Sequence, residues 1–198
     1  MAAITAKMVQ DLRAATGLGM MDCKKALTET DGDMEKAVEL LRKKGMAAVE
    51  KRAGREASEG LVTSYIHPGS RLGVLVETNC ETDFVARTDD FQNFSKDIAM
   101  HIAAQAPLVV QREDVDPEVV EREKAIFLEQ AKNESKPDHI AEKIVTGRLE
   151  KYYQEVVLLE QAFVKDPDKT IQDLITEITA KIGEKIGIRR FACFRLGD

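Results

Sequence analysis

Residues 61–80 have the sequence LVTSYIHPGSRLGVLVETNC, and this stretch decides the class of the fold. Two runs rich in β-branched residues, Leu61–His67 and Leu72–Cys80, flank the turn sequence His-Pro-Gly-Ser at residues 67–70. Proline and glycine supply the backbone angles of a tight turn, and β-branched residues favour an extended chain. The stretch therefore predicts a β-hairpin.

A third strand and two helices are expected to complete a core around this hairpin. The segment 188–196 predicts a strand that joins the hairpin in a three-stranded antiparallel sheet. One side of that strand is expected to close the core through Ile188, Ala192, Phe194 and Leu196. Helical spacing predicts one packed helix from Phe91, Phe94, Ile98 and Ile102, and a last helix after Thr170 from Ile171, Leu174, Ile175 and Ile178.

Between about residues 117 and 159 the chain is highly charged and its apolar positions are sparse. Two long helical segments are joined at residues 133–137, where Pro137 is expected to begin the second helix. The apolar positions suffice for a seam between two helices but are few for a full core. The region therefore predicts an antiparallel helical hairpin that projects from the core.

The first 45 residues predict three short helices, and Gly45 is expected to end the third with a left-handed cap. Residues 47–59 are charged and rich in alanine, which favours a linker helix. The predicted class is α+β. Its parts are a three-helix domain at 1–46, a linker helix at 47–59, and a core domain at 60–198 that includes the helical hairpin.

Charge and composition exclude several kinds of partner. The net charge of −6 opposes an electrostatic grip on nucleic acid, because neutralising phosphates needs a concentrated basic surface. No apolar run approaches the roughly 20 residues that cross a bilayer, and residues 1–7 lack the pattern of a signal peptide. A cytoplasmic protein with a protein partner is expected.

The sequence lacks the common motifs of catalysis and metal binding. There is no phosphate-binding glycine loop, nucleophile elbow or His-Glu-x-x-His pair, so the protein is not expected to be an enzyme or to hold a cofactor. Three dispersed cysteines make no Cys-x-x-Cys pair, which argues against a metal site. They are expected to be buried reduced thiols, with an intermolecular disulfide as the alternative. The lone histidines His67, His101 and His139 are expected to be structural.

Residues 79–87, Asn-Cys-Glu-Thr-Asp-Phe-Val-Ala-Arg, lie between a strand end and a helix start, where loops often carry function. Thr82 can cap the following turn, while Asp83 and Phe84 present a carboxylate and a large apolar ring side by side. On pattern alone, however, the core is the favoured place for Phe84, because Phe91 follows it by one heptad.

Two motifs resemble one known family. Leu12-Arg13, Thr16-Gly17 and residues 19–27 (Gly-Met-Met-Asp-Cys-Lys-Lys-Ala-Leu) form the first, and residues 79–87 form the second. Together they closely resemble elongation factor Ts. Further similarity at residues 99–103, 136–137, 140–144 and 163–165 extends the resemblance over nearly the whole chain.

The resemblance implies a three-helix module like a ubiquitin-associated domain, followed by an α+β core, and a partner that is elongation factor Tu. The family segment matched by Thr82, Asp83, Phe84 and Val85 dislodges the magnesium ion of that GTPase. Leu12, Met20 and Met21 match positions of a second, N-terminal contact. Strand material for only about one sheet marks a short form, which is expected to act as a homodimer with two GTPase molecules.

Two other classes of function are weighed against this one. The three-helix unit could be a general interaction module for ubiquitin-like or helical peptides, without exchange activity. An enzyme using Asp83 or His101 would instead need a pocket in which these groups meet a cofactor or nucleophile, and the sequence predicts none.

Overall fold

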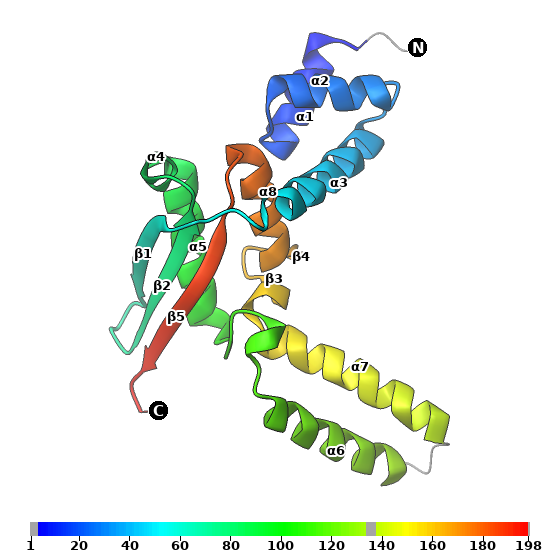
Figure 1. Cartoon of the computed structure of the whole chain (residues 1–198), viewed down its shortest axis with the longest axis vertical. Helices are drawn as coiled ribbons and strands as arrows, with labels where there is room; N and C mark the ends of the chain where they lie inside the picture. The colour runs from blue at the N-terminus through cyan, green and yellow to red at the C-terminus, as the bar shows by residue number, and fades with distance from the viewer. Residues whose placement is uncertain (1–3, 134–137, 198) are drawn as a thin grey trace. The chain divides into compact units, whose positions relative to one another are not determined.

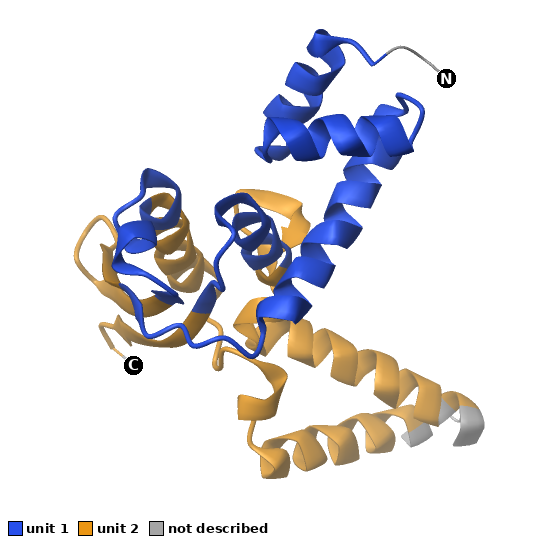
Figure 2. Ribbon diagram, turned by 45° about the horizontal axis from the view of Figure 1, so that its top comes forward, with its two compact units in different colours: residues 1–60, 79–92, 173–187 blue, residues 61–78, 93–172, 188–198 orange. Residues whose placement is uncertain are grey.

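The computed structural model describes residues 4–133 and 138–197. The chain divides into two compact units, each assembled from separate segments of the sequence. Unit 1 comprises residues 1–60, 79–92 and 173–187, and unit 2 comprises residues 61–78, 93–172 and 188–198 (Figure 2). Both proposed contact segments, around residues 12–21 and 82–85, therefore belong to unit 1.

The three N-terminal helices are α1 (Ala6–Thr16), α2 (Met20–Glu29) and α3 (Met34–Arg52). Thr5 caps α1 by accepting a hydrogen bond from the Met8 amide, and Asp33 caps α3 by accepting one from the Lys36 amide. Gly17 ends α1 at φ 68°, a left-handed conformation that glycine adopts without a Cβ clash. The helices enclose a small apolar core of Val9, Leu12, Cys23, Ala26, Leu27, Ala37 and Leu41.

The expected cap at Gly45 is wrong, because α3 continues through this residue to Arg52. A Cβ at Gly45 would lie 3.5 Å from Thr176 Cγ2 and 3.6 Å from Ala180 Cβ, both on helix α8 (Ile171–Ile182). The glycine therefore sits at a close approach of two helices, which the sequence pattern alone does not distinguish from a helix end. The basic residues before it lie mid-helix, where Arg42 pairs with Asp173 at 2.7 Å.

The sheet has the predicted three strands, β1 (Glu59–Ile66), β2 (Leu72–Cys80) and β5 (Gly187–Arg195), in the order β1-β2-β5 (Figure 1). Helix α5 (Asp89–Gln105) packs on one face of it. There the hydroxyl groups of Thr78 and Ser95 hydrogen-bond at 2.5 Å. The buried side chains of this layer include Val74, Val76, Phe94, Ile98 and Ile102. The predicted antiparallel sheet and its covering helix are thus confirmed.

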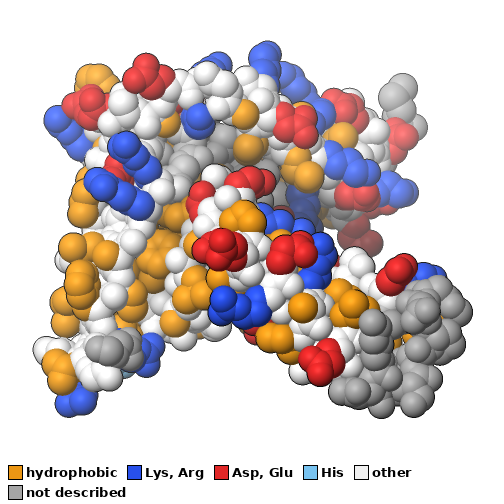
Figure 3. Space-filling model, turned by 60° about the horizontal axis from the view of Figure 1, so that its bottom comes forward, with side chains coloured by type: hydrophobic (Ala, Val, Ile, Leu, Met, Phe, Trp, Pro, Cys, Tyr) orange, Lys and Arg blue, Asp and Glu red, His pale blue; other side chains and the backbone are white. Residues whose placement is uncertain are grey.

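The expected inward face of the last strand is mostly wrong. Of the four residues, Ile188 is buried, whereas Ala192, Phe194 and Leu196 are exposed. Phe194 and Leu196 instead line a shallow hollow of about 490 Å³ together with Ile66 and Leu75. Hydrophobic side chains gather on the side of the molecule where the sheet lies (Figure 3). The alternating pattern identified the strand, but alternation does not show how far along a strand other elements cover it, and β5 is exposed from Ala192 onward.

The helical hairpin consists of α6 (Pro117–Asn133) and α7 (Asp138–Val156), which pack against each other. Pro137, expected to begin the second helix, lies outside the described residues. Arg112, in the short helix Arg112–Asp114, fixes the base of the hairpin: its guanidinium pairs with Glu150 and with Glu160 of the short helix Leu158–Glu160, each at 2.6 Å. The guanidinium also lies 4.2 Å from the ring centre of Tyr153.

A short antiparallel pair, β3 (Ala162–Phe163) and β4 (Asp166–Thr170), precedes α8 and was not predicted. It holds the buried His101, whose Nδ1 accepts a hydrogen bond from the Val164 amide at 3.3 Å. Nε2 therefore carries the proton and donates to Gln161 Oε1 at 2.9 Å. Burial lowers the pKa of His101, and the hydrogen bond to Gln161 opposes that shift. The structural role predicted for this histidine is confirmed.

Candidate functional site

The turn after β2 contains the helix α4 (Asp83–Ala86), which is a single helical turn. Thr82 is its N-cap, in an extended conformation, and the Thr82 hydroxyl accepts a hydrogen bond from the Val85 amide at 3.4 Å. The Asp83 carboxylate pairs with Arg87 at 2.8 Å, one turn further along the chain. The predicted capping role of Thr82 is confirmed.

Phe84 is 77% exposed, so the expectation from pattern alone that it lies in the core is wrong. The heptad spacing to Phe91 fails because α4 ends at Ala86 and α5 begins anew at Asp89, which breaks the helical register. Ala86 is the buried residue of this turn. Two residues apart on a helix, Phe84 and Ala86 face nearly opposite directions, so burial of the alanine turns the ring outward.

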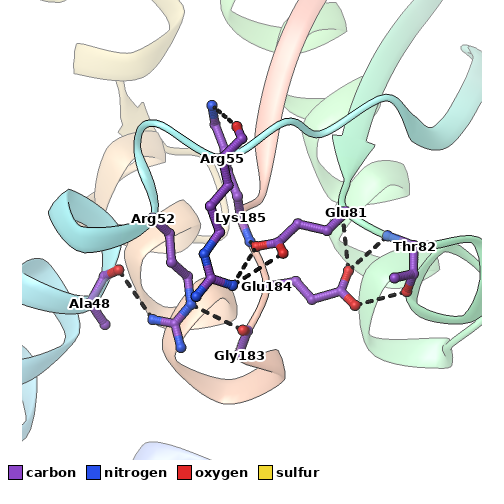
Figure 4. Close-up of polar contacts among 8 residues, drawn as sticks. All are labelled: Ala48, Arg52, Arg55, Glu81, Thr82, Gly183, Glu184 and Lys185. Atoms are coloured by element: carbon purple, nitrogen blue, oxygen red, sulfur yellow. Dashed lines mark hydrogen bonds and ion pairs between the residues drawn. The ribbon is translucent and has the colours of Figure 1, made fainter.

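Glu184, which follows α8, binds the start of this turn (Figure 4). Its Oε2 accepts hydrogen bonds from the amides of Glu81 and Thr82 at 3.1 and 3.0 Å. Its Oε1 accepts one from the Thr82 hydroxyl at 2.8 Å. One carboxylate thus holds three donors at the place where the strand ends.

Glu81 makes the reciprocal contact. Its Oε1 accepts a hydrogen bond from the Lys185 amide at 2.6 Å, and its carboxylate pairs with Arg55 at 3.2 Å. The Lys185 amide and then the Arg55 guanidinium lower the pKa of Glu81. The Lys185 ammonium group donates to the carbonyl groups of Ala53 and Arg55 at 2.7 and 2.8 Å, which ties the chain after α3 to the same cluster.

The three cysteines differ in exposure. Cys23 and Cys80 are buried as expected, whereas Cys193 is exposed, so the expectation of three buried thiols is wrong for Cys193. The Cys80 thiol donates to the Thr82 carbonyl at 3.1 Å. Burial, and then the negative charge of Glu184, raise the pKa of Cys80 to about 11. This thiol therefore stays protonated and serves the turn as a hydrogen-bond donor.

The residues of the second expected contact divide into two groups. Met20 and Met21, on the first turn of α2, are 49% and 64% exposed. Met21 borders a hollow of about 290 Å³ that is also lined by Lys24, Lys25, Thr28 and Glu29. Leu12 is fully buried in the core of the three helices. In this conformation the leucine supports the methionine-bearing helix from beneath and offers no surface of its own.

The described residues that the sequence offered for catalysis each have a structural contact of their own. Asp83 is paired with Arg87, His101 is buried in unit 2, and His67 hydrogen-bonds to the Tyr65 hydroxyl. The His139 side chain lies outside the described residues. Within residues 4–133 and 138–197, no group of three or more His, Cys, Asp or Glu is placed to hold a metal ion. None of the helices described there is long and apolar enough to cross a membrane.

The sequence pattern identified Thr82 as a cap, and the family resemblance singled out Asp83, Phe84 and Val85. Neither gave a structural role to Glu81, Glu184 or Lys185. Glu184 lies 102 residues from Thr82 along the chain, and no local pattern marks it as a partner. The one available signal was Gly183, which ends the apolar periodicity of the last helix and has φ 86°. A turn was therefore predictable there, but its contact with the strand end was not.

Comparison with known proteins identifies the family of this chain. A sequence model of the family described as Elongation factor TS matches residues 3–179. The chain is 64% identical over 195 residues to elongation factor Ts of Geotalea daltonii, covering 98% of this chain and 90% of that protein. It is 61% identical to elongation factor Ts of Syntrophobacter fumaroxidans, covering 98% of both. The chain therefore belongs to the elongation factor Ts family of translation elongation factors.

Proposed function

We propose that this chain is a guanine-nucleotide exchange factor for elongation factor Tu, acting in the cytoplasm. It promotes GDP release by displacing the Mg²⁺ ion of that GTPase and by stabilising its nucleotide-free state. The observation that carries the proposal is the 77% exposure of Phe84 on a turn whose start is fixed by Glu184. A large apolar ring held in water by a rigid turn is suited to inserting into a partner.

The mechanism is thermodynamic coupling and needs no bond chemistry, so the protein is not an enzyme in this proposal. An exchange factor binds the empty GTPase more tightly than the nucleotide-loaded one. The bound exchange factor therefore lowers the affinity for nucleotide, and bound nucleotide lowers the affinity for the exchange factor to the same extent. Asp83 and Phe84 intrude beside the nucleotide. Loss of Mg²⁺ matters because its charge holds the phosphates in place.

Phe84 cannot supply the whole effect. Each tenfold gain in release needs about 1.4 kcal/mol, so a ten-thousandfold gain needs about 5.5 kcal/mol. Burying one phenylalanine contributes roughly 1.5–3 kcal/mol. Metal loss and the second contact, made by Met20 and Met21 over the supporting Leu12, contribute the rest in this proposal.

The same chain is proposed to act as a homodimer. The exposed apolar residues of β1, β2 and β5 support this, because monomeric proteins rarely leave a contiguous apolar patch in water. Light scattering at working concentration is the test. A monomeric species with full exchange activity would contradict the dimer but would leave the exchange function standing.

Binding to purified elongation factor Tu separates exchange from a general interaction module without exchange activity. Immobilised chain should retain nucleotide-free elongation factor Tu, and GDP with Mg²⁺ should elute it, because factor and nucleotide exclude each other. Phe84→Ala should weaken retention, while Leu108→Ala removes a comparably exposed apolar side chain, 70% exposed, as the matched control. Retention that is indifferent to GDP would favour the interaction module.

A further inference from the structure

We propose that Glu184 is the positioning residue for residues 81–86, the turn that carries Phe84: its carboxylate fixes Thr82 and thereby the direction in which Phe84 points. The inference rests on the proposed exchange function. It assigns a role to a residue that lies outside both of the sequence motifs that identify the contact segments.

The end of β2 creates the need for such a residue. The amides of Glu81 and Thr82 lie just past Cys80, the last residue of the strand, so the sheet no longer supplies their acceptors. Partly buried backbone amides need an acceptor, and both find it in one oxygen of Glu184. Helix α4 has only four residues and is too short to be stable by itself. The orientation of Phe84 therefore depends on what holds Thr82.

The hydroxyl of Thr82 connects the Glu184 carboxylate to helix α4. An ionised carboxylate can only accept hydrogen bonds, so the hydroxyl must donate to Glu184 Oε1. Its lone pairs are then free to accept from the Val85 amide, which is the cap of α4. The carboxylate thus sets the direction of the hydroxyl, and the hydroxyl sets the first turn that carries the ring.

Glu184 is itself held from two sides within unit 1. Before it, the Gly183 carbonyl accepts from Arg52 Nε at 3.0 Å, and Gly183 has φ 86°, a conformation that favours glycine. After it, the Lys185 amide donates to Glu81. Glu81 and Glu184 therefore join the segment after β2 to the segment after α8, because each carboxylate accepts a hydrogen bond from the backbone of the other segment (Figure 4). A carboxylate fixed in this way can serve as a rigid support.

If Glu184 positions the turn, its removal should change the maximal rate of GDP release and leave the half-maximal concentration unchanged. The contact through α2 does not involve Glu184, so the factor concentration that gives half-maximal GDP release should be unchanged when the carboxylate is removed. The maximal release rate should fall, because only the fraction of bound molecules with an ordered turn can insert the ring. General unfolding would have the opposite effect. It would lower the concentration of folded chain, so more total chain would be needed for half-maximal release, while the maximal rate would stay the same.

The experiment compares three variants in a titration of labelled GDP release from elongation factor Tu. Glu184→Ala should lower the maximal rate about tenfold, equivalent to ~1.4 kcal/mol, with an unchanged half-maximal concentration. Glu184→Gln should recover part of the rate, because its carbonyl can still accept from both amides. Glu56→Ala, which removes an exposed carboxylate from the same unit, is the control and should match the unmodified chain.

A second readout does not use the GTPase. In Glu184→Ala, the amide protons of Glu81 and Thr82 should exchange with solvent at least about tenfold faster than in Glu56→Ala, since their acceptor is gone. In a double variant with Phe84→Ala, the loss in rate should be smaller than the product of the two single losses, because both act through one turn.

The outcomes separate the two claims. If the unmodified chain does not accelerate GDP release, the exchange function fails, and amide exchange alone then tests the support of the turn. If the unmodified chain is active, the positioning role is overturned by a Glu184→Ala plateau equal to the control, by unchanged amide protection, or by losses that multiply in full with Phe84→Ala.

Discussion

Replacing Phe84 by alanine should slow exchange while leaving the fold intact, and the structure allows the size of both effects to be worked out. Full burial of a phenylalanine contributes roughly 1.5–3 kcal/mol. With 77% of its surface exposed, Phe84 uses only about a quarter of that in the free chain. The variant should therefore lose roughly 0.4–0.7 kcal/mol of folding free energy. That corresponds to a melting-temperature decrease of about 1–3 °C for a chain of this size.

The effect on exchange is larger because the remaining three quarters of the ring are available to a partner. Burying that surface in the transition state of release contributes about 1.1–2.3 kcal/mol. At 1.4 kcal/mol per tenfold, GDP release stimulated by Phe84→Ala should be about 6- to 40-fold slower than with the unmodified chain. Phe84→Leu, which keeps an apolar side chain, should fall in between.

Stopped-flow fluorescence of labelled GDP bound to elongation factor Tu measures the exchange effect, and thermal unfolding measures the stability effect on the same samples. Leu108→Ala is the matched control, since it removes another highly exposed apolar side chain without touching the turn. The reasoning is refuted if Phe84→Ala lowers the melting temperature strongly while the refolded protein exchanges normally. The ring would then be a structural residue.

Three further predictions test the fold. Gly45→Ala should stabilise the chain by about 0.5–1 kcal/mol in urea unfolding, because the added methyl group meets Thr176 at an ordinary contact distance and alanine is the better helix former; destabilisation would contradict this. Burial lowers the pKa of His101 in the folded chain, so as pH drops below about 6.5, the unfolded pKa, the unfolded chain binds more of the proton than the folded chain does: stability should fall, and less so in His101→Gln. At about pH 8 a thiol reagent should label Cys193 before Cys80, whose pKa is raised to about 11; simultaneous labelling would count against the burial of Cys80.

The parts of the fold that sequence predicted are those set by local patterns. The hairpin was predictable because the turn at residues 67–70 and the flanking β-branched runs act over a few residues. The helices α5 and α8 were predictable from apolar spacing. Gly45 was misjudged because the helix continues through it to pack on α8, which lies more than 125 residues later in the chain.

The site shows the same division between local and distant causes. Thr82 was identified as a cap because a cap acts within three residues, on Val85. Phe84 was placed in the core by spacing alone, since spacing carries no information on where one helix ends and the next begins. Glu184 could not be found at all, because its partners come from a strand end about a hundred residues earlier. Long-range polar contacts of this kind depend on the assembled fold.

The most direct test of the central claim is the dissociation rate of labelled GDP from elongation factor Tu as the purified chain is titrated in. If the turn that carries Phe84 favours the empty GTPase, the rate of GDP dissociation should rise with added chain and approach a plateau. A rate that stays at its unassisted value across the whole titration would contradict the account.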